Sequence, residues 1–156
     1  MTSILIPENL KFSNIVKCTL RDEKDNIIQV QKQPNLVVNG WKNNLLDHMG
    51  TTSSDLRIKH GAIGIGLGST SGGSILLKSE LDRAAIVYSR IGQVGTFSIF
   101  FSTTEASGAI TEVGYFGSTS SFTSTNTGTM FNRVLLNSPI NKNNNYTLTI
   151  DLDVEF

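Results

Sequence analysis

The C-terminal stretch TLTIDLDVEF, residues 147–156, decides the fold class. Apolar side chains occupy every second position, and threonine or acidic side chains occupy the positions between them. This period of two is typical of a β-strand that buries one face, because successive side chains of a strand point to opposite sides of the sheet. We expect Asp151, Asp153 and Glu155 to face solvent, since carboxylates two positions apart on a flat strand splay too far to chelate calcium well.

Further runs rich in β-branched and aromatic residues, bounded by polar turns, fill most of the chain. The strands expected from them cover about residues 12–20, 27–30, 62–68, 84–88, 94–103, 110–116 and 130–136. The short turns predict three antiparallel pairings: a hairpin of the first two strands, a hairpin of 94–103 with 110–116, and 130–136 beside the C-terminal strand. Alternate glycines at 64–68 predict a strand face that another group approaches closely.

One helix is expected, over residues 41–49. Trp41, Leu45 and Met49 repeat every four positions, and Gly50 is suited to end the helix. Residues 76–83 are long enough only for a short helical turn. The prediction is therefore an all-β, mainly antiparallel fold, a β-sandwich or jelly roll, with one short α-helix.

The composition is that of one domain with balanced charge. The chain has 156 residues, near the commonest domain size, and its 13 basic and 13 acidic residues give a formal net charge of 0. No overall field attracts it to nucleic acid or to an anionic membrane, and no apolar run approaches the roughly 20 residues that span a bilayer. We expect no nucleic-acid binding and no membrane insertion, and residues 1–34 form an N-terminal hairpin that could serve as an interaction arm.

Residues that usually carry catalysis or hold metals are few and scattered. Histidine occurs only at His48 and His60, and the single cysteine, Cys18, lies in an alternating apolar stretch where a thiol is expected to be buried. The glycine run at 64–68 lacks the third glycine of a dinucleotide-binding fingerprint, because Ser69 occupies that position. We predict a protein that is not an enzyme and that uses no cofactor or metal.

Four charged residues are candidates for structural ion pairs. Glu80 and Arg83 are three positions apart, and Glu112 lies inside an apolar strand. A carboxylate buried among such neighbours needs a partner, because an unpaired buried charge is strongly destabilising. We hypothesise that Glu112 pairs with Arg83 or Arg133 and fixes the register between strands; the alternative is that Glu112 points into solvent.

Several segments, taken in their order along the chain, resemble small virion proteins of tailed phages and prophages. They are NLVVNG (35–40), IGIG (63–66), LKSELDR (77–83), TEVGYF (111–116), GTMFNR (128–133) and the terminal alternating strand. The resemblance covers about residues 35–156, and none of its motifs is a catalytic signature. It implies a structural protein of the phage particle, made in the bacterial cytoplasm and located in the virion, with tail, fibre and baseplate as the commonest contexts.

Three functions are compatible with these observations. We expect a non-enzymatic tail, fibre, baseplate or adaptor subunit that contacts other virion proteins through loops and sheet edges as a symmetric homo-oligomer. A capsid decoration or head-fibre protein is the second structural alternative. The alternative from another class is a carbohydrate-binding module, in which Tyr115 or the loop residue Phe122 stacks on a host-surface glycan. Phe122 interrupts the polar tract 117–128 and is therefore a candidate contact residue.

Overall fold

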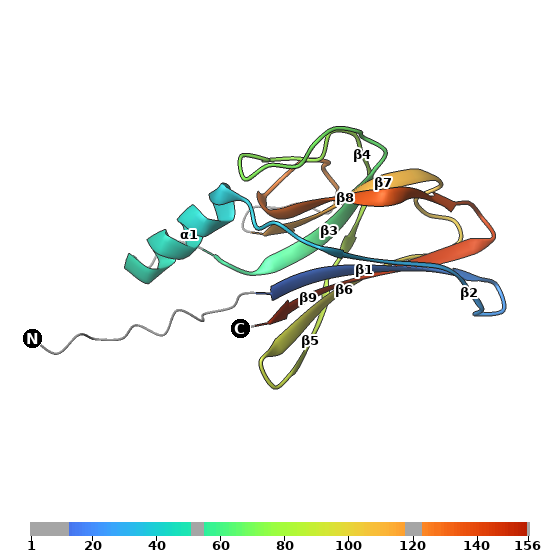
Figure 1. The fold of residues 1–156 in the computed structure, drawn as a ribbon, viewed down its shortest axis with the longest axis horizontal. Helices are drawn as coiled ribbons and strands as arrows, with labels where there is room; N and C mark the ends of the chain where they lie inside the picture. The colour runs from blue at the N-terminus through green and yellow to red at the C-terminus, as the bar shows by residue number, and fades with distance from the viewer. Residues whose placement is uncertain (1–12, 51–54, 118–122, 156) are drawn as a thin grey trace, which may run out of the picture.

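A computed structural model describes residues 13–50, 55–117 and 123–155 (Figure 1). Within these ranges the chain forms nine strands and one helix. Their bounds are β1 Ser13–Asp22, β2 Ile27–Pro34, α1 Asn39–Gly50, β3 Ile58–Gly64, β4 Glu80–Ala85, β5 Val87–Ile91, β6 Val94–Phe101, β7 Gly108–Gly117, β8 Thr129–Lys142 and β9 Tyr146–Glu155. None of the helical structure in these ranges is both long and apolar enough to cross a membrane.

The strands form two antiparallel sheets with an apolar core between them. One sheet has the order β2-β1-β9-β6-β5 and the other the order β4-β3-β7-β8. Figure 1 shows the two sheets as layers, with α1 projecting at one end. The predicted all-β, mainly antiparallel sandwich with one short helix is confirmed, and the helix is a little longer at both ends than the expected 41–49.

Strand β9 is the centre of the five-stranded sheet, where it pairs with β1 on one side and β6 on the other. Its alternation has the predicted outcome: Leu148, Ile150 and Leu152 are fully buried. Asp151 and Asp153 lie on the opposite face and accept hydrogen bonds of 2.6 Å from the hydroxyls of neighbouring β6 residues. The acidic positions therefore belong to the outer face of the sheet.

The four-stranded sheet is buried on both of its faces. Its inner face contributes to the main core, which includes side chains from both sheets. The connection from β3 to β4, residues 65–79, folds back over its outer face, and we call it the covering segment. Beneath it lies a second apolar cluster made of Val38, Ala62, Leu77, Phe116 and Met130. Strand β7 is consequently buried at every position from 110 to 117.

Two of the predicted strand pairings are wrong. Strands β6 and β7 do not form a hairpin, because β6 belongs to the five-stranded sheet and β7 to the four-stranded one. Strands β8 and β9 diverge in the same way: β8 pairs with β7, whereas β9 lies between β1 and β6. Alternation specifies which face of a strand is buried and not which strand is its neighbour, so a short connection can cross between sheets.

The expected helical turn at 76–83 is also absent. Leu77 is fully buried, Lys78 and Ser79 lie in a bend, and β4 begins at Glu80. The backbone amides of Lys78 and Ser79 donate to a side chain of the sheet and therefore have no need of helical partners. The strand expected at 84–88 is interrupted at Ile86, where the chain passes from β4 in one sheet to β5 in the other.

The predicted N-terminal hairpin forms from β1 and β2. It is an integral part of the five-stranded sheet, because β1 also pairs with β9 along ten residues. Val16, Cys18 and Leu20 of β1 are buried in the main core. Within the described residues this hairpin is therefore a wall of the sandwich and not a separate arm.

We predict that the thiol of Cys18 does not react with Ellman's reagent in the native protein at mildly alkaline pH. Cys18 is 1% exposed, and burial, reinforced by the charge of Asp151, raises its pKa to about 12. Absorbance measurements should detect one reactive thiol per chain only after denaturation in concentrated guanidinium chloride. Rapid labelling of a chain that keeps its native circular dichroism spectrum would contradict this placement.

Candidate functional site

Strand β7 carries a buried charge, the carboxylate of Glu112. The side chain is fully buried and faces the covering segment. It accepts hydrogen bonds from three backbone amides of that segment: Gly66 at 3.1 Å, Lys78 at 3.1 Å and Ser79 at 2.8 Å. Burial raises the pKa of Glu112, but the hydrogen bonds from Ser79 and Lys78, together with Arg133, outweigh burial and hold the pKa below its usual value. The carboxylate is therefore ionised at neutral pH.

Arg133 on β8 neutralises this carboxylate. Its Nε donates to Oε2 of Glu112 at 2.7 Å, and its Nη2 lies 2.7 Å from the same oxygen. Its Nη1 donates to the carbonyl oxygens of Ser69, at 3.0 Å, and Gly68, at 3.4 Å. The structure thus pairs Glu112 with Arg133, one of the two partners considered from the sequence, and both side chains bind the covering segment as well as each other.

Gly64 and Gly66 make this contact possible. A Cβ atom at Gly64 would lie 2.6 Å from Oε1 of Glu112 and 2.5 Å from the carbonyl oxygen of Ser79, and one at Gly66 would collide with the same carboxylate oxygen. The group that approaches the glycine face is therefore the carboxylate of Glu112. The strand itself ends at Gly64, so the glycine run serves the covering segment and not a longer strand.

The other two ion-pair candidates, Glu80 and Arg83, lie on β4 and pair with each other, so Arg83 is not the partner of Glu112. Arg83 donates to both carboxylate oxygens of Glu80, at 2.6 Å and 2.9 Å, and both side chains are almost completely buried. Arg83 also donates to the hydroxyl of Thr127, and Glu80 accepts from the amide of Asn126. The guanidinium carbon of Arg83 lies 5.1 Å from the ring centroid of Phe116. This pair fixes the loop before β8 against the sheet.

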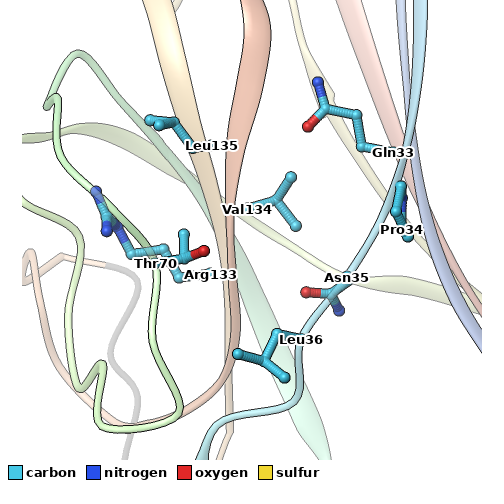
Figure 2. A pocket seen from close by; sticks show the side chains of 8 residues that line it. All are labelled: Gln33, Pro34, Asn35, Leu36, Thr70, Arg133, Val134 and Leu135. Atoms are coloured by element: carbon cyan, nitrogen blue, oxygen red, sulfur yellow. The ribbon is translucent and has the colours of Figure 1, made fainter.

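A groove of about 300 Å³ lies between the end of β2 and strand β8 (Figure 2). Its walls include Asn35 on one side and Val134 on the other, with Arg133 and Thr70 beyond. Both polar atoms of the Asn35 amide are buried without a hydrogen-bond partner among the described residues. Arg133 is the one ionisable side chain in these walls, and its guanidinium is engaged with Glu112. Among the described residues of these walls the one hydroxyl belongs to Thr70, and no carboxylate, histidine or cysteine is present.

Tyr115, one of the two aromatic residues proposed for glycan stacking, does not provide a surface. Tyr115 is completely buried, and its hydroxyl donates to the carbonyl oxygens of Phe97 and Ile150, each at 3.2 Å. The assignment of Tyr115 as a stacking residue is therefore wrong, because β7 is covered on both faces. Phe122 lies outside the described residues. In the part of the chain that the structure describes, no three side chains of His, Cys, Asp or Glu are grouped to hold a metal ion.

Large apolar side chains are exposed on β2, at Ile27, Ile28 and Val30, and three further sets lie elsewhere in the described part of the chain. On β5, Val87 is 72% exposed, Tyr88 56% and Ile91 85%. On α1, Trp41 packs edge-on against Phe131, whereas Leu45, Leu46 and Met49 are exposed, so most of the predicted apolar stripe of the helix faces solvent. The covering segment exposes the third set, Ile65, Leu67, Ile75 and Leu76. Exposed apolar groups gathered in this way are typical of surfaces that contact other proteins.

Comparison with protein-family models, curated proteins and solved structures found no match to this chain. Function is therefore inferred from the geometry of the chain itself. The buried ion pairs hold one part of the fold against another, and the exposed apolar side chains are available to contact a partner.

We predict that Glu112→Gln lowers the free energy of unfolding by about 3–5 kcal/mol, because it leaves the buried Arg133 without a counter-charge. Arg133→Met should be similarly destabilising, and the double variant should cost less than the sum of the two single variants. Denaturant unfolding followed by circular dichroism measures all three. Arg57→Gln, which removes an exposed ion pair with Asp55, is the control and should change stability little. A Glu112→Gln variant as stable as this control would contradict the assignment.

We predict that Gly66→Ala destabilises the protein by roughly 1–3 kcal/mol, because the added methyl group collides with the Glu112 carboxylate and with Lys78. Gly73→Ala is the matched control in the same covering segment, where the nearest atom is 3.8 Å from the added carbon. Thermal unfolding of both variants under the same conditions compares them. Equal melting temperatures would show that the covering segment is not held against Glu112.

Proposed function

We propose that this chain is a non-enzymatic structural component of a tailed-phage virion, a tail, fibre, baseplate or adaptor subunit that works through protein–protein contacts. The observation that supports this proposal is the exposure of large apolar side chains on β5, α1 and the covering segment. Scattered single apolar residues are normal on a protein surface, whereas sets on regular elements mark surfaces that bind partners.

The buried ion pairs support the same proposal, because their role is structural. The Glu112–Arg133 and Glu80–Arg83 pairs are occupied with backbone groups and with each other, so neither pair is available to a substrate. Their effect is to fix loops on a rigid sandwich. Rigid β-sandwiches with fixed loops are a common scaffold for viral shells and appendages.

The particle itself is inferred from the resemblance of residues 35–156 to virion proteins. Its two most specific segments, 112–116 on β7 and 128–133 at the start of the adjacent strand β8, contain Glu112 and Arg133. The resemblance therefore concerns the residues that hold the covering segment in place. A likeness in such residues supports a shared scaffold in particle assembly.

We predict that the chain is present in purified particles at a fixed number of copies, at the tail. Quantitative mass spectrometry of gradient-purified particles gives the copy number, and cryo-electron microscopy locates the density of a 17.0 kDa β domain. Density on the capsid would replace the tail assignment by decoration or head-fibre function, and absence from particles would overturn the virion proposal.

A variant sharpens this test. Leu46→Glu with Met49→Glu places charges on the exposed apolar side of α1 and should reduce incorporation without unfolding the sandwich, because neither side chain is buried. Lys42→Glu on the same helix changes an exposed position that is already polar and is the control. Incorporation unaffected by the double variant would exclude α1 as a contact surface.

A further inference from the structure

Strand β5 is a free edge of the five-stranded sheet. It pairs with β6 on one side, and no strand in the described part of the chain pairs with its other side. All five of its residues are exposed. Figure 1 shows the β5–β6 hairpin extending beyond the body of the sandwich, away from the four-stranded sheet. The edge is therefore accessible over its whole length.

The hairpin turn determines which backbone groups this edge presents. Gly92 and Gln93 form a two-residue turn, with Gly92 at a positive φ of 59°. Such a turn closes on a hydrogen-bonded pair, here Ile91 with Val94, and hydrogen-bonded pairs then alternate along the ladder. Residues 87, 89 and 91 therefore bond β6, while the N–H and C=O groups of Tyr88 and Arg90 point to the free edge.

We propose that β5 pairs with β5 of a second copy of this chain, an inference that rests on the proposed role in assembly. The two strands run antiparallel around a two-fold axis that passes through Ser89. In this register Tyr88 of each copy exchanges backbone hydrogen bonds with Arg90 of the other. The two five-stranded sheets then continue as one sheet across the interface.

The side chains of β5 are complementary to themselves in this register. On the outer face Val87 lies opposite Ile91 of the second copy, twice, so the most exposed large apolar side chain of the described residues gains an apolar partner. On the inner face Arg90 lies opposite Tyr88 of the second copy, where a guanidinium can stack on the ring. Tyr88 already packs against Phe97, with the ring centroids 4.9 Å apart and the planes inclined at 39°.

Other two-fold registers in which the outward backbone groups of the two β5 strands still face each other are less favourable. An axis through Arg90 would place two guanidinium groups directly opposite each other, which is destabilising. An axis through Tyr88 would leave Ile91 without a partner. A shift of the register by one residue would place the outward backbone groups of one copy opposite residues of the other copy whose N–H and C=O groups already bond β6. The axis through Ser89 uses the whole strand and places no like charges opposite.

The other sheet edges are protected, which singles out β5. Gln31 of β2 donates to the carbonyl oxygen of Ser138 on β8, and Gln33, with its amide oriented to satisfy both atoms, bonds Leu135 and Asn137 of β8. These bridges occupy backbone groups along the edge of β8, whereas the β2 edge carries Lys32 and Pro34, residue types that block pairing. Strand β4 is six residues long and carries charged side chains at three of them. Strand β5 has neither proline nor lysine, the usual means of blocking an edge.

Cysteine cross-linking tests the axis directly. Two residues on a two-fold axis in a pair that is not hydrogen-bonded have Cα atoms about 4.5 Å apart, within the range of a disulfide. We predict that purified Ser89→Cys forms a disulfide-linked dimer under mild oxidation and that dithiothreitol reverses it. Gln93→Cys, exposed in the turn of the same hairpin but off the axis, is the control and should cross-link far more slowly. The buried Cys18 does not interfere.

A concentration series in analytical ultracentrifugation tests the unmodified chain, which should reach a dimer. Ile91→Glu should weaken the dimer about tenfold or more, since it removes both apolar pairs, while Ile75→Glu, at a similarly exposed residue of the covering segment, should not. A chain that stays monomeric throughout, with Ser89→Cys cross-linking no faster than Gln93→Cys, would overturn the proposal. So would an oligomer that Ile91→Glu leaves unchanged.

These measurements use purified protein and a surface distinct from α1. A dimer from a chain that is absent from particles would uphold the β5 interface and reject the virion role. A monomer that is nevertheless incorporated into particles would do the reverse.

Discussion

One buried negative charge organises the four-stranded sheet. A carboxylate removed from water is tolerated only when its charge and its lone pairs are satisfied, and Glu112 meets this condition with Arg133 and with three backbone amides from the covering segment. Because these donors belong to a part of the chain some 33 to 46 positions earlier, the covering segment must lie across the sheet for the charge to be buried. Its position then buries Leu77 and Phe116, gives the sheet its second apolar cluster, and requires glycine at 64 and 66.

The sequence predicted the strands well and their partners poorly, and the difference has a physical origin. Alternation along residues 147–156 reflects the burial of one face, a local property that every side chain reports, and the structure buries Leu148, Ile150 and Leu152 accordingly. Sheet membership is a long-range property. The connections after β6 and after β8 are as short as hairpin loops, yet each crosses from one sheet to the other. Nothing in a short polar turn distinguishes these two outcomes.

The site residues divide along the same line. The need of Glu112 for a partner could be inferred from its apolar neighbours, and Arg133 was one of two candidates. The backbone donors could not be inferred, because an N–H group is present at every residue except proline and gives no sequence signal. Tyr115 was misassigned for a related reason: an aromatic residue on a strand faces either core or solvent, and here the core lies on that side of β7. The exposure of β5 was likewise hidden, since Val87, Tyr88 and Ile91 have the composition of a buried strand.

The two kinds of surface in this protein follow from how each handles unsatisfied groups. The outer face of the four-stranded sheet satisfies its charges and apolar side chains within the chain, at the cost of a fixed covering segment. The β5 edge does neither: its outward backbone groups lack a strand partner among the described residues, and its apolar side chains lie in water. A soluble monomer usually blocks such an edge with charge, proline or cover. One open edge beside three protected ones is expected where the protein pairs with another chain. The side chains on the two sides of Ser89 complement each other, so an identical strand is the best match for β5.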